Sequence, residues 1–427
     1  MNNKIYIGSI NIKDYTSFKG MYDFDLRDEN GFIYQWTVIL GNNNTGKTNF
    51  LKAVAGLEPV VAKNEENQNY CIPIEIEKSF ITDKNEYSIE SELYFSNNVQ
   101  SYQAFSEKMS VYKDTPYKFS PEKIMYIWGY NKSIAIKGDY EFLKDIKIYG
   151  YGVSRKFGES SLSQKETTSN SETLFYNNKT LLNIEEWLLQ LDYATKNNDK
   201  IANGQLIKLK ELINSEIFPE IEGVRFISEN AKNHVEFLTK EGWRKLSQLG
   251  YGYQTTLSWI FDFSKKMFER YPNSENPLKE PAVVLIDELD LHLHPQWQRQ
   301  IINFLTTIFS QTQFIVTTHS PFIIQSIEKI NLFILDRTSE GINVHRPKFK
   351  TFKGWAIEEI LDEIHGLGEK TKSDNYLMLI KQFDKALDSN DYEAANRAYT
   401  QLCDILHPTS PERKLLKVQL SQIVPND

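Results

Sequence analysis

The chain has 427 residues, of which 40% are hydrophobic and 25% are charged, a composition typical of globular proteins with a sizeable core. No apolar stretch is long enough to cross a membrane, and residues 1–13 are too polar for a signal peptide. The two cysteines have no metal-site or disulfide spacing, so we expect a cytoplasmic protein. The net charge of −8 gives no evident long-range attraction to nucleic acid, so any DNA contact would have to use a local basic patch.

The first predicted elements are strands that lead into a glycine-rich loop. Isoleucines at positions 5, 7, 10 and 12 recur at nearly every second residue, which is the period of a half-buried strand. Residues 36–40 (WTVIL) predict a short buried strand, and residues 49–56 (NFLKAVAG) predict a helix after the loop. A strand, a glycine loop and a helix in this order form the unit that holds a nucleotide phosphate.

Residues 41–48 (GNNNTGKT), here called the P-loop, match the full pattern G-x-x-x-x-G-K-[ST]. The glycines let backbone amides turn toward phosphate oxygens, Lys47 reaches the β- and γ-phosphates, and the Thr48 hydroxyl binds Mg²⁺. An accidental glycine turn is disfavoured by the flanking strand and helix. The predicted ATP-binding residues are Gly41, Asn42, Asn43, Asn44, Thr45, Gly46, Lys47, Thr48 and Asn49.

A long segment without a chemical motif follows the P-loop unit. Its later part predicts a strand at 146–152, a polar loop at 158–178, a helix at 183–193 capped by Asn183, a helix at 203–216, and strands near 223–227 and 234–238.

Small residues then precede a predicted helix at 255–268. Residues 246–254 (LSQLGYGYQ) lie at its start, where exposed amides bind anions. If this end faces a second copy of the chain, we expect Ser247, Gly250 and Gly252 to contact the γ-phosphate of the ATP held there. The alternative is an ordinary glycine-rich helix start.

Residues 282–288 (AVVLIDE) predict a buried strand that ends in two acids. Asp287, at the carboxyl end of the strand, is expected to hold magnesium. Glu288 is placed to orient the attacking water as a general base. Two residues further along, Asp290 is a candidate for contacts across a dimer interface.

Residues 314–320 (FIVTTHS) predict another buried strand, which leads to His319. Ligands in parallel α/β sheets lie beyond the carboxyl ends of the strands. We therefore expect His319 to meet the γ-phosphate and to report its presence, rather than to be a satisfied histidine at a strand end.

Two further sequence features, a histidine pair and a basic run, each allow two interpretations. His292 and His294 could form a metal pair, but they lack a third ligand nearby, which favours a structural or interface role. The run at 345–355 (HRPKFKTFKGW) favours a solvated strand edge over a nucleic-acid contact. Its basic residues are Arg346, Lys348, Lys350 and Lys353.

Together these blocks resemble the ABC-type ATPases of the RecF, SMC and OLD groups. The resemblance rests on the Asn-rich P-loop, on residues 287–295 (DELDLHLHP) and on residues 317–321 (TTHSP). It implies an α/β P-loop fold with a mixed sheet flanked by helices, a helical insertion and a C-terminal helical region. It also implies two copies paired head to tail around ATP. The signature departs from the family's Leu-Ser-x-Gly, because aligning residues 250–252 (GYG) with Ser-x-Gly loses the serine hydroxyl.

We accordingly expect four regions along the chain. They are a first ATPase lobe with the P-loop (1–155), a loop and helical insertion (156–222), a second ATPase lobe with the signature, the acidic strand and His319 (223–350), and a helical partner-docking region (351–427). Within the last region, helices are predicted near 357–364, 376–387 and 391–406, the last two as a pair.

Shorter blocks resemble the ATPase subunits of bacterial anti-phage systems, namely the PtuA family of Septu-type systems and its retron-associated relatives. They are residues 149–155 (YGYGVSR), 183–193 (NIEEWLLQLDY) and 252–256 (GYQTT), together with the helical tail. This resemblance implies a separately encoded HNH nuclease that the ATPase controls. The chain itself carries no cluster with HNH spacing and no acidic Toprim-like block.

The expected function is therefore that of a regulatory ATPase that slowly hydrolyses Mg-ATP in a homodimer or larger assembly, with DNA contacted through the complex and no membrane contact. Two alternatives stay open. A DNA-repair or recombination ATPase would need a basic face or long coiled-coil arms, and no heptad run of that length is visible. A non-hydrolysing scaffold would suit the unusual signature but not the intact Glu288.

Overall fold

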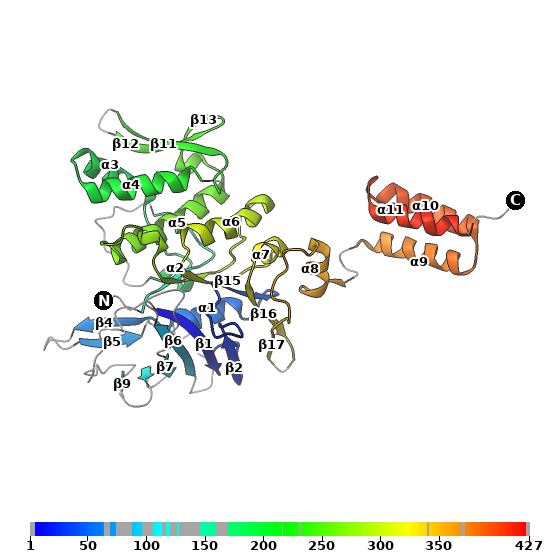
Figure 1. Ribbon diagram of the computed structural model, residues 1–427, viewed down its shortest axis with the longest axis horizontal. Helices are drawn as coiled ribbons and strands as arrows, with labels where there is room; N and C mark the ends of the chain where they lie inside the picture. The colour runs from blue at the N-terminus through cyan, green and yellow to red at the C-terminus, as the bar shows by residue number, and fades with distance from the viewer. Residues whose placement is uncertain are drawn as a thin grey trace. The chain divides into compact units, whose positions relative to one another are not determined.

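The computed structural model describes residues 5–63, 69–73, 88–95, 106–112, 117–119, 126–127, 146–158, 170–215, 217–229, 232–339, 341–368 and 372–423. The chain divides into two compact units, Met1–Gly354 and Trp355–Asp427. The first unit carries the P-loop, the acidic strand and His319, and the second unit is helical (Figure 1). None of the described helices combines the length and apolarity needed to span a bilayer.

Among the described strands, six form the central sheet of the first unit in the order β10-β14-β15-β3-β16-β17. They are β10 (Ile148–Tyr151), β14 (Ala282–Ile286), β15 (Thr312–Thr317), β3 (Trp36–Gly41), β16 (Ile330–Arg337) and β17 (Ile342–His345). Neighbours run parallel from β10 to β16, and β17 is antiparallel, which confirms the mixed sheet. Since parallel strands end at one edge, the segments that follow β3, β14 and β15 lie together.

The two faces of the central sheet bury different helices, because successive strand residues point to opposite sides. Leu285 shares a hydrophobic core with α1 (Lys47–Ala55). On the other face, the Tyr151 ring packs against Trp259 of α5 (Tyr251–Arg270), with ring centroids 5.7 Å apart. Helix α6 (Pro295–Ile308) joins α5 there, and α7 (Pro321–Ser326) packs beside α6.

A second sheet covers the side of α1 that faces away from the central sheet. In the described residues its order is β2-β1-β6-β7-β8-β9, and all of its pairs are antiparallel. Ile10 and Phe24 of this sheet lie in the same core as Phe50 of α1, so α1 lies between two sheets. The strands are β1 (Ile5–Lys13), β2 (Met21–Asp25), β6 (Ser88–Phe95), β7 (Ser106–Tyr112), β8 (Tyr117–Phe119) and β9 (Tyr126–Ile127); β4 (Pro59–Lys63) and β5 (Asn69–Pro73) pair separately.

The segment between β10 and α5 forms the helical insertion and a small sheet. It contains α2 (Glu172–Phe175), α3 (Ile184–Lys196), α4 (Lys200–Ile213), β11 (Ile221–Glu229), β12 (Lys232–Thr239) and β13 (Gly242–Lys245). Asn183 caps α3 as expected, because its side chain accepts a hydrogen bond from the Glu186 amide at 3.2 Å. Helices α3 and α4 pack against β12 and β11 (Figure 1).

The polar loop expected at 158–178 is wrong in its described C-terminal part. Helix α2 forms there, and Leu174 and Phe175 enter the core beside α1. Two adjacent large apolar side chains outweigh the polar composition around them, because burying each one stabilises the fold by about 1.5–3 kcal/mol. Residues 159–169 lie outside the described part of the chain.

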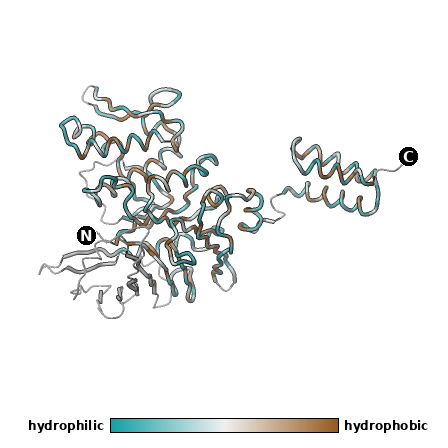
Figure 2. The backbone as a smooth tube through the Cα atoms, in the orientation of Figure 1, coloured by the Kyte–Doolittle hydropathy of each residue, from teal (hydrophilic) through white to brown (hydrophobic). Residues whose placement is uncertain are grey.

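The C-terminal unit has its own hydrophobic core. Helix α8 (Ile357–Glu363) precedes α9 (Asp374–Asp388), α10 (Tyr392–Ile405) and α11 (Pro411–Ser421). Phe383 and Leu402 are fully buried in a cluster that α11 joins through Leu416 and Leu420. Helices α9 and α10 therefore pack together as the expected pair, and α11 joins them to make a cluster of three helices. Figure 2 shows hydrophobic and hydrophilic residues alternating along these helices, as one-sided burial requires.

Candidate nucleotide site

The P-loop connects β3 to α1, and its backbone needs glycine at two positions. Gly41 and Gly46 have φ values of 155° and 96°. A Cβ atom at Gly41 would lie 2.4 Å from the Leu335 carbonyl oxygen, and one at Gly46 would lie 2.6 Å from the Ser17 hydroxyl. Both the backbone angle and the close neighbours therefore exclude a side chain at these positions.

The Lys47 ammonium folds back over the P-loop. It donates hydrogen bonds to the carbonyl oxygens of Gly41 and Asn42, at 2.7 Å and 2.9 Å. Burial lowers the pKa of Lys47, whereas the nearby carboxylates of Asp287, Glu288 and Asp290 raise it. The site thus holds one lysine ammonium among three carboxylates. The ammonium can attract phosphate oxygens, and the carboxylates can attract the metal ion bound to that phosphate.

The P-loop and the acidic strand meet directly. The Thr48 hydroxyl donates to Asp287 Oδ2 at 2.7 Å, across 239 positions of sequence. The Thr317 hydroxyl at the end of β15 donates to Asp287 Oδ1 at 2.7 Å and accepts from the Glu288 amide at 2.7 Å. The motifs had not indicated a role for Thr317, although it lies only two positions before His319.

The donor set at Thr48 and Asp287 suits magnesium. A hydroxyl and a carboxylate oxygen are hard ligands, and Mg²⁺ usually takes one or two protein groups together with water and substrate phosphates. Within the described ranges, no cluster of three or more His, Cys, Asp or Glu side chains could hold a metal ion. The residues therefore fit a metal that is shared with a phosphate, rather than one held entirely by protein.

Glu288 directly follows Asp287 and has an unusual backbone. Its φ is 50°, in the left-handed region that few residues other than glycine adopt. Its side chain is half-buried, and its carboxylate makes no hydrogen bond to the residues that the structure describes. Such a carboxylate has lone pairs available for a water molecule, which a general base requires.

The His319 ring lies close to these charges. Its Nε2 atom is buried and has no hydrogen-bond partner in the described part of the chain. Burial lowers its pKa, and the Lys47 ammonium lowers it further. A neutral ring with an unpaired buried nitrogen is a candidate to bind a ligand atom, because buried polar groups are otherwise paired.

Asp290 links the acidic strand to the segment around His319 within one chain. Its Oδ1 atom accepts hydrogen bonds from the Thr318 hydroxyl at 2.5 Å and from the His319 amide at 3.3 Å. Its expected contact with a second copy stays a prediction.

The signature residues surround the start of α5. Ser247 lies in a short 3-10 helix (Leu246–Gln248), Gly250 is the N-cap residue, and Gly252 is in the first turn. The helix therefore begins before the expected residue 255. A Cβ atom at Gly252 would lie 2.4 Å from the His292 carbonyl oxygen, so Gly252 allows α5 to approach the segment that follows the acidic strand.

The other predicted features have partners within the chain. The His294 ring accepts from the Gln296 amide at 3.4 Å and caps α6. In the basic run, Lys350 pairs with Glu29 at 2.6 Å, and the Arg346 guanidinium lies 5.7 Å from the Tyr34 ring centroid. These contacts, next to edge strand β17, favour the solvated-edge reading.

Arg155 is a site residue for which the motifs gave no role. It is only 3% exposed and donates to the backbone carbonyl oxygens of Gly152, Asp287 and Glu288. The one signal for it was its place at the end of the block at 149–155, just beyond β10.

Comparison with known proteins gives a family match and several relatives. A family model described as "AAA domain, putative AbiEii toxin, Type IV TA system" matches residues 36–325. The Septu protein PtuA of Bacillus thuringiensis is 37% identical over 190 residues, which cover 43% of this chain and 48% of that protein. The "Retron Vc95 probable ATPase" of Vibrio cholerae serotype O1 biovar El Tor is 24% identical over 443 aligned positions, covering 90% of this chain and 84% of that protein.

The solved structure of an SMC head bound to the C-winged helix domain of ScpA aligns with a TM-score of 0.46 and 15% identity, over 80% of this chain and 97% of that one. The match to the Septu protein of Bacillus thuringiensis spans less than half of that relative's length. The family model, by contrast, covers more than half of this chain and includes the P-loop, the acidic strand and His319. The chain therefore belongs to this family of AAA-domain proteins.

Proposed function

We propose that the chain is the ATP-binding and slowly hydrolysing regulatory subunit of a bacterial anti-phage defence complex. In this proposal it works in the cytoplasm and controls a separately encoded HNH-type nuclease. The observation that carries the ATPase part is the 2.7 Å hydrogen bond from Thr48 to Asp287, because it unites the P-loop with the acidic strand. The relatives' names, Septu PtuA and retron ATPase, support the defence role.

Each side chain of the site has a distinct task in this proposal. The P-loop amides and Lys47 bind the triphosphate oxygens, and Thr48 and Asp287 hold Mg²⁺, which supplies positive charge against the phosphates when bound. The Glu288 carboxylate orients the attacking water and accepts its proton. The neutral His319 ring would bind the γ-phosphate through Nε2, the atom that lacks a partner among the described residues.

A second copy of the chain would complete the site. The first turn of α5 has no side-chain cap, so its amides are available to an anion. We place the γ-phosphate of the partner's ATP there, next to Ser247, Gly250 and Gly252, with Asp290 at the dimer interface. Because residues 250–252 offer no serine hydroxyl, they stabilise the developing charge less, and we expect slow hydrolysis.

Phosphate release and the mass of the complex test this function together. With Mg-ATP, Glu288→Gln should still bind nucleotide, lose about 100-fold or more in phosphate release, and accumulate as a dimer. The exposed Glu211→Gln in α4 is a matched control and should behave like the wild type. Equal, negligible release by the wild type and by Glu288→Gln would instead support the non-hydrolysing scaffold, which the missing serine favours.

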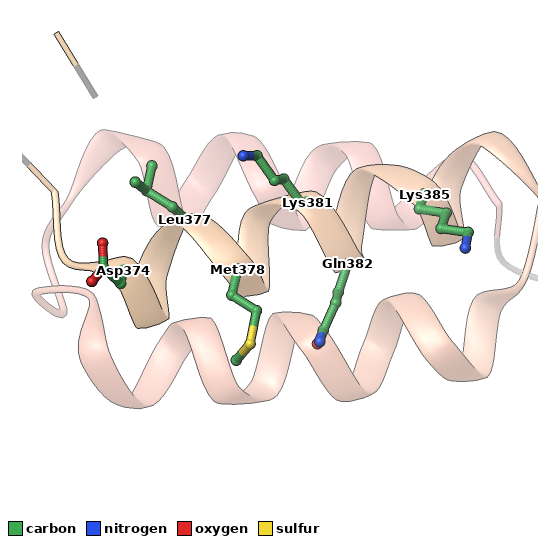
Figure 3. A pocket seen from close by; sticks show the side chains of 6 residues that line it. All are labelled: Asp374, Leu377, Met378, Lys381, Gln382 and Lys385. Atoms are coloured by element: carbon green, nitrogen blue, oxygen red, sulfur yellow. The ribbon is translucent and has the colours of Figure 1, made fainter. Parts of the chain in front are cut away.

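The C-terminal unit is the proposed docking surface for the nuclease, and DNA would be contacted through that complex. Leu415 and Val418 of α11 are 58% and 57% exposed, and Met378 of α9 is 50% exposed. Met378 also lines a shallow hollow of about 490 Å³ along α9, and Figure 3 shows it pointing to the same side of the helix as Gln382. Leu415 and Val418 are three positions apart on one helix and so share a face, and an exposed apolar patch of this kind is typical of a partner surface.

A further inference from the structure

Arg155 is a buried cation whose hydrogen bonds run to the backbone of the acidic strand. Its Nε atom donates to the Gly152 carbonyl at 3.0 Å, and its NH2 group donates to the Glu288 carbonyl at 2.6 Å and to the Asp287 carbonyl. Within the described residues, these partners are all carbonyl oxygens, and no carboxylate forms an ion pair with it. The guanidinium therefore bridges the end of β10 and the end of β14.

Burying this charge is costly. Burial lowers the pKa of Arg155 to about 10, against the opposing effect of the carboxylates of Asp287, Asp290 and Glu288. Arg155 thus remains charged at neutral pH. Buried ions without a paired counter-ion destabilise a fold, and an apolar side chain would fill the same space at lower cost. The guanidinium must therefore contribute something that an apolar residue cannot.

The backbone of Glu288 is held on both sides in its left-handed conformation. Arg155 binds its carbonyl oxygen, and the Thr317 hydroxyl binds its amide at 2.7 Å. A φ of 50° is strained for a non-glycine residue and persists only where neighbouring contacts enforce it. Without Arg155, the Glu288 peptide can relax, and the direction of its carboxylate changes with it.

We propose that Arg155 is a positioning residue that fixes the Glu288 backbone and so aims its carboxylate at the attacking water. This inference rests on the proposed hydrolysis. The hydrogen bonds of Arg155 end on backbone carbonyl oxygens and not on the side chains proposed to hold phosphate or Mg²⁺, so nucleotide binding does not depend on them directly. Its effect should fall on turnover rather than on affinity.

The test compares Arg155→Met, which keeps the length of the side chain, with Arg155→Lys and a matched control, Arg225→Met. Arg225 pairs with Glu236 at 2.7 Å on the small sheet. In Arg155→Met we expect kcat for Mg-ATP to fall by about 10- to 100-fold. KM should change by less than about threefold, because binding contacts are retained. Arg155→Lys should be intermediate, since one ammonium cannot reach all three carbonyls, and Arg225→Met should match the wild type.

The double variant Arg155→Met with Glu288→Gln separates positioning from a general structural role. If Arg155 acts through Glu288, adding Arg155→Met to Glu288→Gln should change phosphate release by less than about twofold. The proposal would be overturned if Arg155→Met lowered phosphate release in the Glu288→Gln background by as large a factor as it does in the wild type. A KM that rises as much as kcat falls would also overturn it.

Hydrogen exchange without nucleotide provides a readout independent of activity. The Glu288 and Leu289 amides, which bond to Thr317, should exchange about tenfold or more faster in Arg155→Met, while α9–α11 keep their protection. Unchanged exchange at these amides would overturn the inference about Arg155, whether or not the wild type hydrolyses ATP. Absence of ATP hydrolysis by the wild type would contradict the proposed function and would leave this exchange test valid. Loss of protection throughout the variant would likewise reject the positioning role and indicate a structural one.

Discussion

At the residue scale, the charges of the nucleotide site couple its stability to pH. His319 has a pKa below the ordinary value of 6.5, because burial and the Lys47 ammonium both disfavour its protonated form. The unfolded chain therefore binds a proton at this position before the folded protein does. By linkage, this contribution to stability is complete above about pH 6.5 and is lost as the pH falls below that value.

We predict that His319→Gln reduces the loss of stability between about pH 7.5 and about pH 5.5, because glutamine cannot titrate. Urea unfolding at the two pH values measures the effect. His345→Gln, at an exposed strand end, is the control for the substitution itself. A variant at His319 that loses as much stability on acidification as the wild type would contradict this origin.

Some of these residues could be located from the sequence because their positions are local. Lys47 and Thr48 stand at fixed places in a loop that runs into a helix, and Asp287 ends a strand marked by its own apolar run. Arg155 could not be found in this way. Its partners on the acidic strand lie 132 and 133 positions away, and strand pairing, rather than any spacing in the chain, brings them together.

At the element scale, α5 depends on one close backbone contact. Alanine is normally better than glycine within a helix, by about 0.5–1 kcal/mol. At Gly252, however, a Cβ atom would lie 2.4 Å from the His292 carbonyl oxygen, whereas at Gly204 in α4 no atom lies within 4 Å. The same substitution should therefore have opposite signs in the two helices.

We predict that Gly252→Ala destabilises the protein by about 1–3 kcal/mol, because α5 must shift away from the acidic strand. Gly204→Ala should stabilise it by about 0.5–1 kcal/mol. Denaturant unfolding measures both values. Equal effects in the two variants would show that the His292 contact does not constrain α5.

The elements that sequence patterns predicted best are those marked by an apolar run. The strands at 282–286 and 36–40 are uninterrupted apolar runs, and both are present. Helix α11 lies in the region expected to be helical, but it was not placed as an individual helix, because only two buried leucines mark its apolar side among charged residues. Its N-terminal signal was nevertheless readable: Ser410 caps the helix and Pro411 occupies its first turn.

At the scale of the whole molecule, the two units have separate hydrophobic cores. The nucleotide site lies within Met1–Gly354, and the cluster around Phe383 lies within Trp355–Asp427. A change on the surface of the C-terminal unit should therefore leave the nucleotide site unaffected. This separation allows partner docking to be tested apart from ATP binding.

We predict that Leu415→Glu combined with Val418→Glu leaves the fold and ATP binding intact but prevents the HNH nuclease from co-purifying with the chain. Both side chains are more than half exposed, so charging them should change stability by no more than about 0.5 kcal/mol while it disrupts an apolar contact. The matched control places glutamates at Ile201 and Ile207, which are 65% and 48% exposed on α4. Equal retention of the nuclease by both double variants would exclude α11 from the docking surface, and loss in both would indicate that the insertion also takes part.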